Sequence, residues 1–575
     1  MQTASCAAAG VLRERRERRL HRVVSSCAVA GSAVLDDTCD TTLQAGRLSH
    51  DCDVVIIGAG VSGLCAAAVL SSQGVRCTVV EAHSIAGGAA HSFERGEFKF
   101  DSGPSFYFGL SGPRGTSANA LRQALDLLDE AVPCVPYTSW RVHTRDGAFD
   151  CTTNEEEYCR TIRRFAGADG EAQWRRLQAR LKPLSAFSAV LPFAALRNDP
   201  AVLLSLSRFA PGLLSGMAGL ASSPAGLLGS ITALNGSFGD VIASAGVTHP
   251  WLLALLDLES FVISGCLARN TPAPEMAFVL DGRFSGAPLD HPVGGGQAWV
   301  DALVRGISRR GGRVELRAPV ARIVVTNGRA AGVELGGGRG VVTACTAVIA
   351  STSVWDTAKL LPPGAAERFT ALATTTPECE SFMHLHVGFS TDGMDIASVG
   401  IHHLVVENFA VGAIQGARNV INISIPSALD DTLAPPGFAV AHVYAAANEN
   451  FDDWGRLARG SAAYDALKEE RCRPLWAALE RVIPDIRARA RTQLVGSPLT
   501  HARYLRRHRG SYGPALAPGA WPGPATELPG LWRCGDSTFP GIGIPAAAAS
   551  GLIVANTLLS PQQHGAVLDL ITRRG

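Results

Sequence analysis

The chain has almost no net charge and very little lysine. Its 575 residues carry 52 lysines and arginines against 51 aspartates and glutamates, a formal net charge of +1. The only lysines are Lys99, Lys182, Lys359 and Lys468. A chain so balanced has no broad positive field to gather nucleic acid, so we expect no nucleic-acid partner. Hydrophobic residues make up 47% of the sequence, which excludes a disordered protein, and the length predicts two or more structural units.

Cysteine pairs and nucleophile motifs are missing as well. The 14 cysteines are scattered from Cys6 to Cys534 and form no C-x-x-C pair. This argues against a secreted disulfide framework and a cysteine zinc site, and favours free thiols in a reducing compartment. No G-x-S-x-G motif occurs, and no acid–base pair follows from spacing. We therefore expect a cofactor to carry the chemistry, and the sequence assigns no catalytic side chain.

The first fifty residues differ in composition from the rest. Residues 1–35 contain six arginines, no lysine, and only Glu14 and Glu17 as acids, among many alanines, serines and valines. An arginine- and serine-rich, acid-poor segment is typical of a cleavable organelle presequence. A disordered tail is the alternative.

Residues 209–239 form a long stretch without a charged residue. Its length would span a bilayer, but Pro211, Pro224 and many glycines and serines argue against a spanning helix. Two interpretations stay open. The segment forms an apolar surface that dips into a membrane or lines a lipid tunnel, or it forms a buried helical hairpin.

The first strong motif is the sequence DVVIIGAGVSG at residues 53–63. Its apolar run predicts a parallel strand buried on both faces, and a G-x-G-x-x-G turn and a helix of small residues follow. A second strand, at residues 76–80, ends at Glu81, where an acid accepts hydrogen bonds from a ribose. We predict a dinucleotide site that includes Gly58, Ala59, Gly60, Val61, Ser62, Gly63 and Glu81.

Either NAD or FAD satisfies that motif, and the rest of the chain favours FAD. A glycine turn at Gly87 and Gly88 follows the acid, and a second one lies near the far end of the chain, before a helix predicted from about Pro545. A flavin needs an acceptor for its ribityl chain and a helix N-terminus near its ring, whereas nicotinamide does not. The second set of predicted contacts is Gly535, Asp536, Gly543 and Ile544. Val320, in a predicted strand, pairs with the adenine edge or serves as a core residue only.

Two polar clusters are ambiguous. His384 and His386 share one face of a predicted strand, with His402 and His403 nearby, and paired imidazoles can ligate iron or zinc. Because no carboxylate accompanies them, we expect packed histidines and no metal. The arginines of residues 503–509 either meet anionic lipid headgroups or form a solvated face.

Several segments resemble the FAD-dependent carotenoid desaturase and isomerase family of the amine-oxidase-like flavoproteins, most closely its carotenoid isomerase (prolycopene isomerase) branch from plants and algae. They are GAGVSGL (58–64), AGGAAHSFERGEFKFDSGPS (86–105), ECESFMHLHVGF (378–389), HARYLRRHRGSYGPA (501–515) and CGDSTFPGIGIPAAAASG (534–551). The resemblance covers residues 51–565. Ala89 and Ala90 depart from the pattern, because many relatives carry arginine or serine directly after the glycine pair.

The resemblance implies an α/β fold in which an FAD-binding Rossmann-like domain carries an inserted α+β substrate domain with a long apolar tunnel. The aromatic residues Phe98, Phe100, Phe106, Tyr107 and Phe108 are available to stack on a polyene there, or form core. The expected parts are a targeting peptide or disordered tail (1–50), FAD-binding segments (51–125, 291–360 and 499–575, the last with a C-terminal helix), a mainly helical substrate segment (126–290) and a mixed-sheet one (361–498).

Three functions are compatible with the resemblance. The first is a redox-neutral cis–trans isomerisation of a linear polyene such as a poly-cis lycopene. The second is a carotenoid desaturase or retinoid saturase that exchanges electrons with a quinone or another reductant. The third is a carotenoid carrier in which FAD is structural. The resemblance also implies a plastid enzyme, in the stroma or at a membrane surface.

Overall fold

The computed structural model describes residues 50–115, 117–220, 236–284, 289–517 and 519–572. The predicted presequence therefore lies outside the described residues, apart from residue 50, and so does most of the second half of the uncharged stretch at 209–239. Residues 202–220 form helix α5 (Val202–Leu220). In the described part of the chain, none of the helices is both long enough and apolar enough to cross a membrane.

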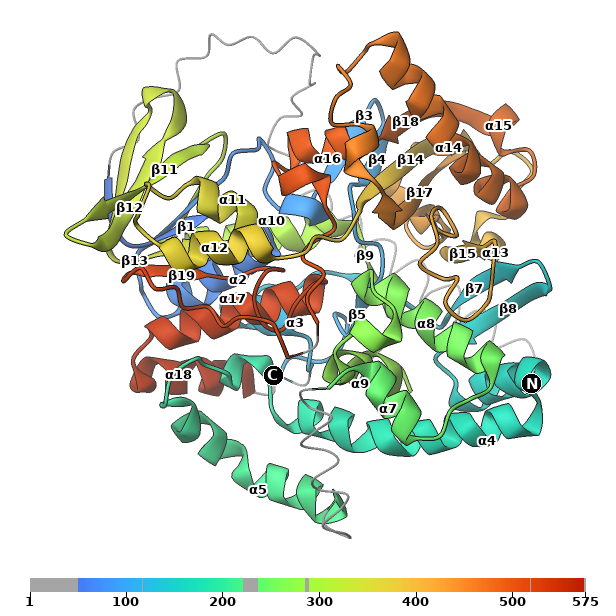
Figure 1. Cartoon of the computed structure of the whole chain (residues 1–575), viewed down its shortest axis with the longest axis horizontal. Coiled ribbons are helices and arrows are strands. Elements are labelled where there is room, and N and C mark those ends of the chain that lie inside the picture. The colour runs from blue at the N-terminus through green and yellow to red at the C-terminus, as the bar shows by residue number, and fades with distance from the viewer. Residues whose placement is uncertain (1–49, 116, 221–235, 285–288, 518, 573–575) are drawn as a thin grey trace, which may run out of the picture. The chain divides into compact units, whose positions relative to one another are not determined.

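The first sheet has seven strands drawn from three separate parts of the chain (Figure 1). Its order is β10 (Arg313–Glu315), β2 (Cys77–Val80), β1 (His50–Ile57), β13 (Gly340–Ala350), β12 (Arg329–Leu335) and β11 (Val320–Thr326), with β19 (Leu531–Arg533) also paired to β13. Strands β10, β2, β1, β13 and β19 run parallel to their neighbours, and β11 to β13 form an antiparallel meander. The predicted strands at 53–57, 76–80 and 320–325 are confirmed.

Strand β1 is buried on both faces, as its apolar run predicts. Val54 and Ile56 face one hydrophobic core, while Val55 and Ile57 face another. The first core packs against α2 (Val61–Ser72), α3 (Ala120–Leu128), α10 (Gly296–Arg309), α17 (Ile544–Leu558) and α18 (Pro561–Thr572). The second packs against the meander, α11 (Val354–Lys359) and α12 (Glu367–Thr375). Helices on both faces of a parallel sheet explain why its strands are continuously apolar.

Helices α2 and α17 come from opposite ends of the chain and pack directly on each other. A Cβ atom at Gly551 of α17 would lie 2.2 Å from the carbonyl oxygen of Ser62, so only glycine permits this contact. The first turns of the two helices consequently open onto the same region of the molecule, on the side where the strands of the sheet end.

The second sheet is mixed and also has seven strands. Its order is β18 (Ala490–Gly496), β14 (Ser381–Ser390), β17 (Phe438–Glu449), β16 (Val420–Ser424), β15 (His402–Val406), β7 (Ser139–Thr144) and β8 (Gly147–Thr152). One face packs on α14 (Ala462–Val482) through residues such as Leu385, Leu475 and Trp476.

Smaller elements complete the described chain. Two short sheets pair β3 (Ser92–Arg95) with β4 (Phe98–Asp101), and β9 (Leu289–Pro292) with β5 (Tyr107–Phe108) and β6 (Cys134–Tyr137). The remaining helices are α4 (Glu155–Val190), α7 (Phe238–Ser244), α8 (Pro250–Ser264), α9 (Ala273–Gly282), α13 (Ile396–Val399), α15 (Ile486–Arg489) and α16 (Pro498–Tyr504). Helices α4, α7, α8 and α9 pack with β7 and β8 around a third core.

Candidate active site

A cavity of about 950 Å³ lies between the two sheets and the helices of the third core. Nearly all the residues predicted to bind a cofactor line it, although they are far apart in sequence. Those lining it are Gly58, Gly60, Val61, Ser62, Glu81, Gly87, Gly88, Val320, Gly535, Asp536, Gly543 and Ile544. Ala59 and Gly63 do not line it. They shape the backbone of the turn beside it.

Each of the three glycines in the first glycine turn meets a different steric requirement. Gly58 has φ +99°, a conformation that side-chain-bearing residues rarely adopt. A Cβ at Gly63 would lie 2.1 Å from the Gly58 carbonyl oxygen, so this glycine lets α2 approach the strand. No atom lies within 4 Å of the corresponding position at Gly60. Gly60 therefore leaves open space at the N-terminus of α2, where backbone amides and the helix dipole favour an anion.

Glu81 and the turn at Gly87 tie this region together. One Glu81 carboxylate oxygen accepts a hydrogen bond from the Ala59 amide (2.8 Å) and the other from the His83 amide (2.7 Å). Each oxygen keeps a further lone pair for a ligand. The Gly87 amide donates to the Ala59 carbonyl (2.7 Å), which brings the second glycine pair against the first turn.

The C-terminal glycine turn lies close to the N-terminal one, since a Cβ atom at Gly535 would be 3.3 Å from the Ser62 hydroxyl oxygen. Ser62 and Ser351 share a hydrogen bond of 2.7 Å between their hydroxyls, and the Gly535 amide donates to the Ser550 hydroxyl (2.8 Å). Gly543, with φ +101°, precedes α17, whose first turn contains Pro545. The structure thus opens two helix N-termini onto one cavity.

Asp536 has a partner that the sequence did not reveal. Its carboxylate accepts a hydrogen bond from the Arg507 guanidinium (2.5 Å) and another from the Ser537 hydroxyl (3.1 Å). Arg507 also donates to the carbonyls of Ser511 and Tyr512, so it fixes the loop that follows α16. The arginines of residues 503–509 therefore differ in their surroundings. Arg507 is paired within the protein, whereas Arg503 is exposed.

The rest of the cavity wall is mainly apolar and aromatic. Of the five aromatic residues predicted to lie beside the cofactor, Phe106 and Phe108 line the cavity. Phe98, Phe100 and Tyr107 do not line it, and Phe100 packs in a small core with Leu433 and Val440 instead. The other aromatic residues of the wall are Trp140, Phe193, Phe382, Tyr444, Tyr504, Tyr512, Trp521 and Phe539.

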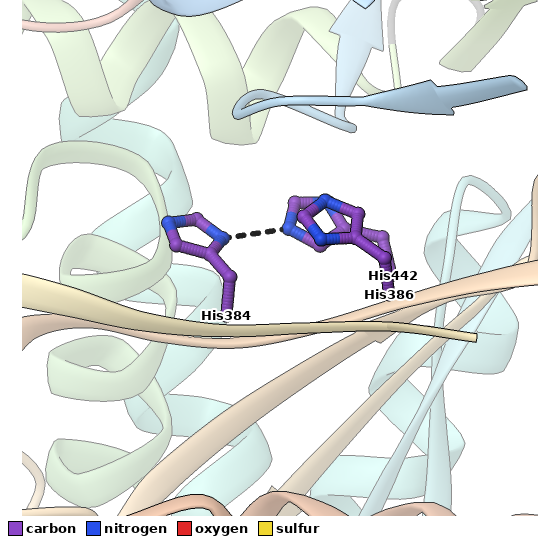
Figure 2. Close-up of side chains that lie close together, drawn as sticks. All are labelled: His384, His386 and His442. Atoms are coloured by element: carbon purple, nitrogen blue, oxygen red, sulfur yellow. Dashed lines mark hydrogen bonds between the residues drawn. The ribbon is translucent and has the colours of Figure 1, made fainter. Parts of the chain in front are cut away.

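Four buried histidines, His384, His386, His442 and His501, form one cluster, and His501 also lines the cavity. Figure 2 shows the other three. Two hydrogen bonds join three of them, one between His384 Nδ1 and His442 Nε2 (2.8 Å) and one between His384 Nε2 and His501 Nε2 (2.5 Å). His386 Nε2 lies 3.0 Å from the Asp101 carbonyl oxygen, to which it donates. The sequence places His384 and His386 on one face of a strand, but the strand register adds His442, which lies opposite His386.

Burial keeps all four imidazoles neutral. It lowers the pKa of His386 to about 4 and that of His501 to about 3. The pKa values of His384 and His442 lie well below the ordinary value for the same reason, with smaller contributions from their histidine neighbours. Removing a charged imidazole from water costs more free energy than the hydrogen bonds of the cluster contribute.

The cluster's ring geometry does not favour a metal ion. Ligand nitrogens of His384, His386 and His442 lie within 4.8 Å of one another. However, the His386 and His442 rings are stacked, with centroids 4.3 Å apart and planes inclined by only 7°. An imidazole ligand holds a metal about 2 Å away near its ring plane, and two stacked rings cannot both do so for one ion. The expectation that no metal binds here stays a prediction.

Comparisons with known proteins identify the family. The model of the family described as flavin containing amine oxidoreductase matches residues 61–559. The chain belongs to this family. The protein is therefore an enzyme that uses a flavin, and its amine-oxidase-like fold is the one predicted.

Relatives and solved structures agree with this assignment. The chloroplastic prolycopene isomerase of Daucus carota is 29% identical over 560 residues, which cover 92% of this chain and 84% of that protein. The lycopene-forming phytoene desaturase of Pseudescherichia vulneris is 24% identical over 534 residues, 88% and 99% of the two chains. Wild-type putrescine oxidase bound to putrescine shares the fold, with a TM-score of 0.54, 15% identity and coverage of 92% of this chain and 100% of that one.

The cavity fits a flavin on two counts. The open space at Gly60 admits a phosphate against the amides of α2, and the turn before α17 offers a second set of amides at the far end of the C-terminal motif. Both features face the same cavity of about 950 Å³.

We predict that Gly60→Val removes flavin without unfolding the protein. The backbone of Gly60 has φ −73°, and its Cβ position is empty, so the flavin-free fold accepts a side chain there. The added methyl groups would fill the space required by the phosphates. Flavin absorbance of the purified protein and its circular dichroism spectrum measure the two effects. Retained flavin would show that the phosphates do not lie at Gly60.

We also predict that the histidine cluster destabilises the fold in acid. His386 has its pKa lowered to about 4, so between pH 6.5 and 4 the unfolded chain binds a proton that the folded chain does not. Stability therefore falls with decreasing pH in this range, by about 1.4 kcal/mol per pH unit for this residue. His386→Gln should flatten the decline by that amount. Denaturant unfolding measured from pH 8 to pH 4 tests it, and identical pH slopes would contradict the prediction. The pH 8 comparison serves as the control, since the imidazole is neutral in both states there.

Proposed function

We propose that this protein is an FAD-dependent carotenoid isomerase, which converts cis double bonds of a linear polyene such as a poly-cis lycopene to trans. One observation carries the proposal. A single cavity joins the two glycine turns to an apolar, aromatic wall, so a long hydrocarbon can lie against the cofactor site without leaving the protein. The similarity to prolycopene isomerase over 92% of the chain supports the same reaction.

We assign the ends of FAD to particular residues. The adenine lies near Val320 at the start of β11, the adenosine ribose at Glu81, and the pyrophosphate at Gly58–Gly63 and the N-terminus of α2. Gly87 and Gly88 approach the middle of the cofactor. Gly535 and Asp536 contact the ribityl chain. The flavin ring lies against Gly543 and Ile544 at the start of α17.

The protein groups position the substrate and exclude water. Bound flavin supplies electron density and, when reduced, a negative charge that stabilises transient positive charge in the polyene. The aromatic side chains of the wall offer faces on which a conjugated chain can stack. Neutral His501, which also lines the cavity, adds no charge to this apolar surface.

The domain boundaries follow the same division. Residues 51–125, 291–360 and 499–575 make up the FAD-binding domain, and residues 126–290 and 361–498 make up the substrate domain. Residues 1–50 act as a plastid presequence or a tail. The plastid location is supported by the chloroplastic relative and by the arginine-rich, acid-poor N-terminus.

We also propose peripheral binding to a membrane, from which an apolar substrate would enter. Leu203 and Leu204, adjacent at the start of α5, have 69% and 63% of their surface exposed. An exposed apolar pair at a helix start can insert into a lipid surface. Flotation with lipid vesicles tests this. The double variant Leu203→Ser, Leu204→Ser should float less than the native protein, and equal flotation would contradict the proposal.

Desaturation is the second candidate. The relationship to a lycopene-forming phytoene desaturase favours it, and it would require a quinone or another electron partner. Isomerisation conserves the mass of the substrate, whereas desaturation lowers it by two hydrogens. The two reactions are therefore separable by one measurement.

We expect anaerobically reduced holoenzyme to convert a poly-cis carotene to a more trans isomer of unchanged mass. Chromatography with absorbance and mass detection measures the product, and the flavin-free Gly60→Val protein serves as the control. Loss of two hydrogens would identify a desaturase. Tight binding of the polyene without any turnover, in either redox state of the flavin, would identify a carrier.

A further inference from the structure

Five carboxylate side chains line the cavity, and four of them are held by donors. Glu81 accepts from two backbone amides, and Asp536 accepts from Arg507. Asp356 accepts from the Ser353 hydroxyl, the Lys359 ammonium and the His508 amide. Glu259 accepts from the Tyr158 hydroxyl and the buried Arg283 guanidinium. The fifth is Glu275, and among the described residues no hydrogen bond or ion pair reaches its carboxyl group.

Glu275 occupies a fixed position in the cavity wall. It lies in the first turn of α9, whose next two residues, Met276 and Ala277, are completely buried in the third core. That anchoring holds the helix in place while the Glu275 side chain lines the cavity, together with Pro272, Pro274 and Val279. The neighbouring wall is mainly apolar, and the described residues offer the carboxyl group no hydrogen-bond partner.

The start of α17 also lines this cavity, through residues such as Ile544 and Pro545. The carbonyl of Ile263, another wall residue, is 4.0 Å from the Cβ position of Gly543. Tyr512 lies within electrostatic reach of Glu275 and packs its ring against Gly265, at the end of α8. Glu275 and the start of α17 therefore line the same cavity.

We propose that Glu275 is the proton donor and acceptor in the isomerisation. This rests on the proposed function. The carboxyl O–H bond breaks, and its proton forms a C–H bond with one carbon of a cis double bond, using the electron pair of that bond. The former double bond is then single and rotates, with the positive charge delocalised along the conjugated chain. The carboxylate next removes a proton from the same carbon, and the double bond reforms. No atom or electron is gained or lost overall.

The carboxyl group is in the required state. Burial raises the pKa of Glu275 to about 8, so at neutral pH the group is protonated and can donate. The titratable groups that act on it are the Cys266 thiol and the Tyr512 hydroxyl, and burial raises the pKa of Tyr512 as well. His501 and His91 also line the cavity, but their pKa values of about 3 and about 4 leave them neutral at pH 7, and a neutral imidazole is too weak an acid to protonate a double bond.

Isomerisation in D₂O tests the proton transfer. Reduced holoenzyme should produce a trans polyene that carries deuterium at the rotated bond. Glu275→Gln, which keeps the size of the side chain, should lower the rate by about 100-fold or more and leave flavin absorbance unchanged. Glu275→Asp should retain partial activity and deuterium incorporation. Glu367→Gln, an exposed glutamate in the first turn of α12, is the matched control and should behave like the native enzyme.

Infrared spectroscopy tests the protonation state without any turnover. The difference spectrum between native protein and Glu275→Gln at pH 7 should contain a carboxylic-acid C=O band, which disappears as the pH rises through about 8. The isomerisation rate should fall over the same range, because the acid form is lost.

The outcomes separate this proposal from the proposed function. Isomerisation without deuterium in the product, or full activity in Glu275→Gln, overturns the role of Glu275 and leaves the isomerase intact. No conversion of any poly-cis carotene by the native holoenzyme overturns the proposed function. A missing carboxylic-acid band at pH 7 overturns the role of Glu275 whether or not the enzyme turns over.

Discussion

The arrangement of the site depends on one close contact between helices α2 and α17. Gly63 lets α2 lie against the turn that precedes it, and Gly551 lets α17 lie against the backbone of Ser62. A single β-carbon at either position would separate the elements by more than side-chain adjustment can absorb. Because of this contact, the two glycine turns line one cavity, and the ends of the parallel strands lie beside it.

Electrostatics in the cavity follows from burial. Carboxylates near the glycine turns are held by amides, guanidinium groups or hydroxyls, whereas the imidazoles behind the wall are neutral. The buried pair of Arg283 and Glu259 carries two charges that compensate each other. In such surroundings a lone carboxyl such as Glu275 takes up a proton instead of a charge. The cavity therefore offers an apolar substrate few uncompensated charges.

Local motifs were predictable from the sequence, and contacts between distant segments were not. Each glycine turn combines a strand, a tight turn and a helix within about twenty residues, so its pattern specifies its shape. His442 joined the histidine cluster through the register of β14 and β17, which no spacing reveals. Arg507 was one of several arginines in a short segment, and only its packing against Asp536 distinguishes it. Glu275 follows two prolines at the start of a helix, a pattern with no functional signal. That no described donor reaches its carboxyl group depends on how α8 and the segment around Tyr512 pack beside it.

Strand β19 and helix α17 also determine when the site can be completed during synthesis. The ribosome makes β1 and α2 long before it makes their partners at residues 531–558. Until then β13 is unpaired where β19 later binds, and the α17 segment that packs on Ser62 of α2 is absent. A nascent chain therefore exposes half of the flavin site until residues 531–558 have been made, and a truncation before Leu531 would leave that half open.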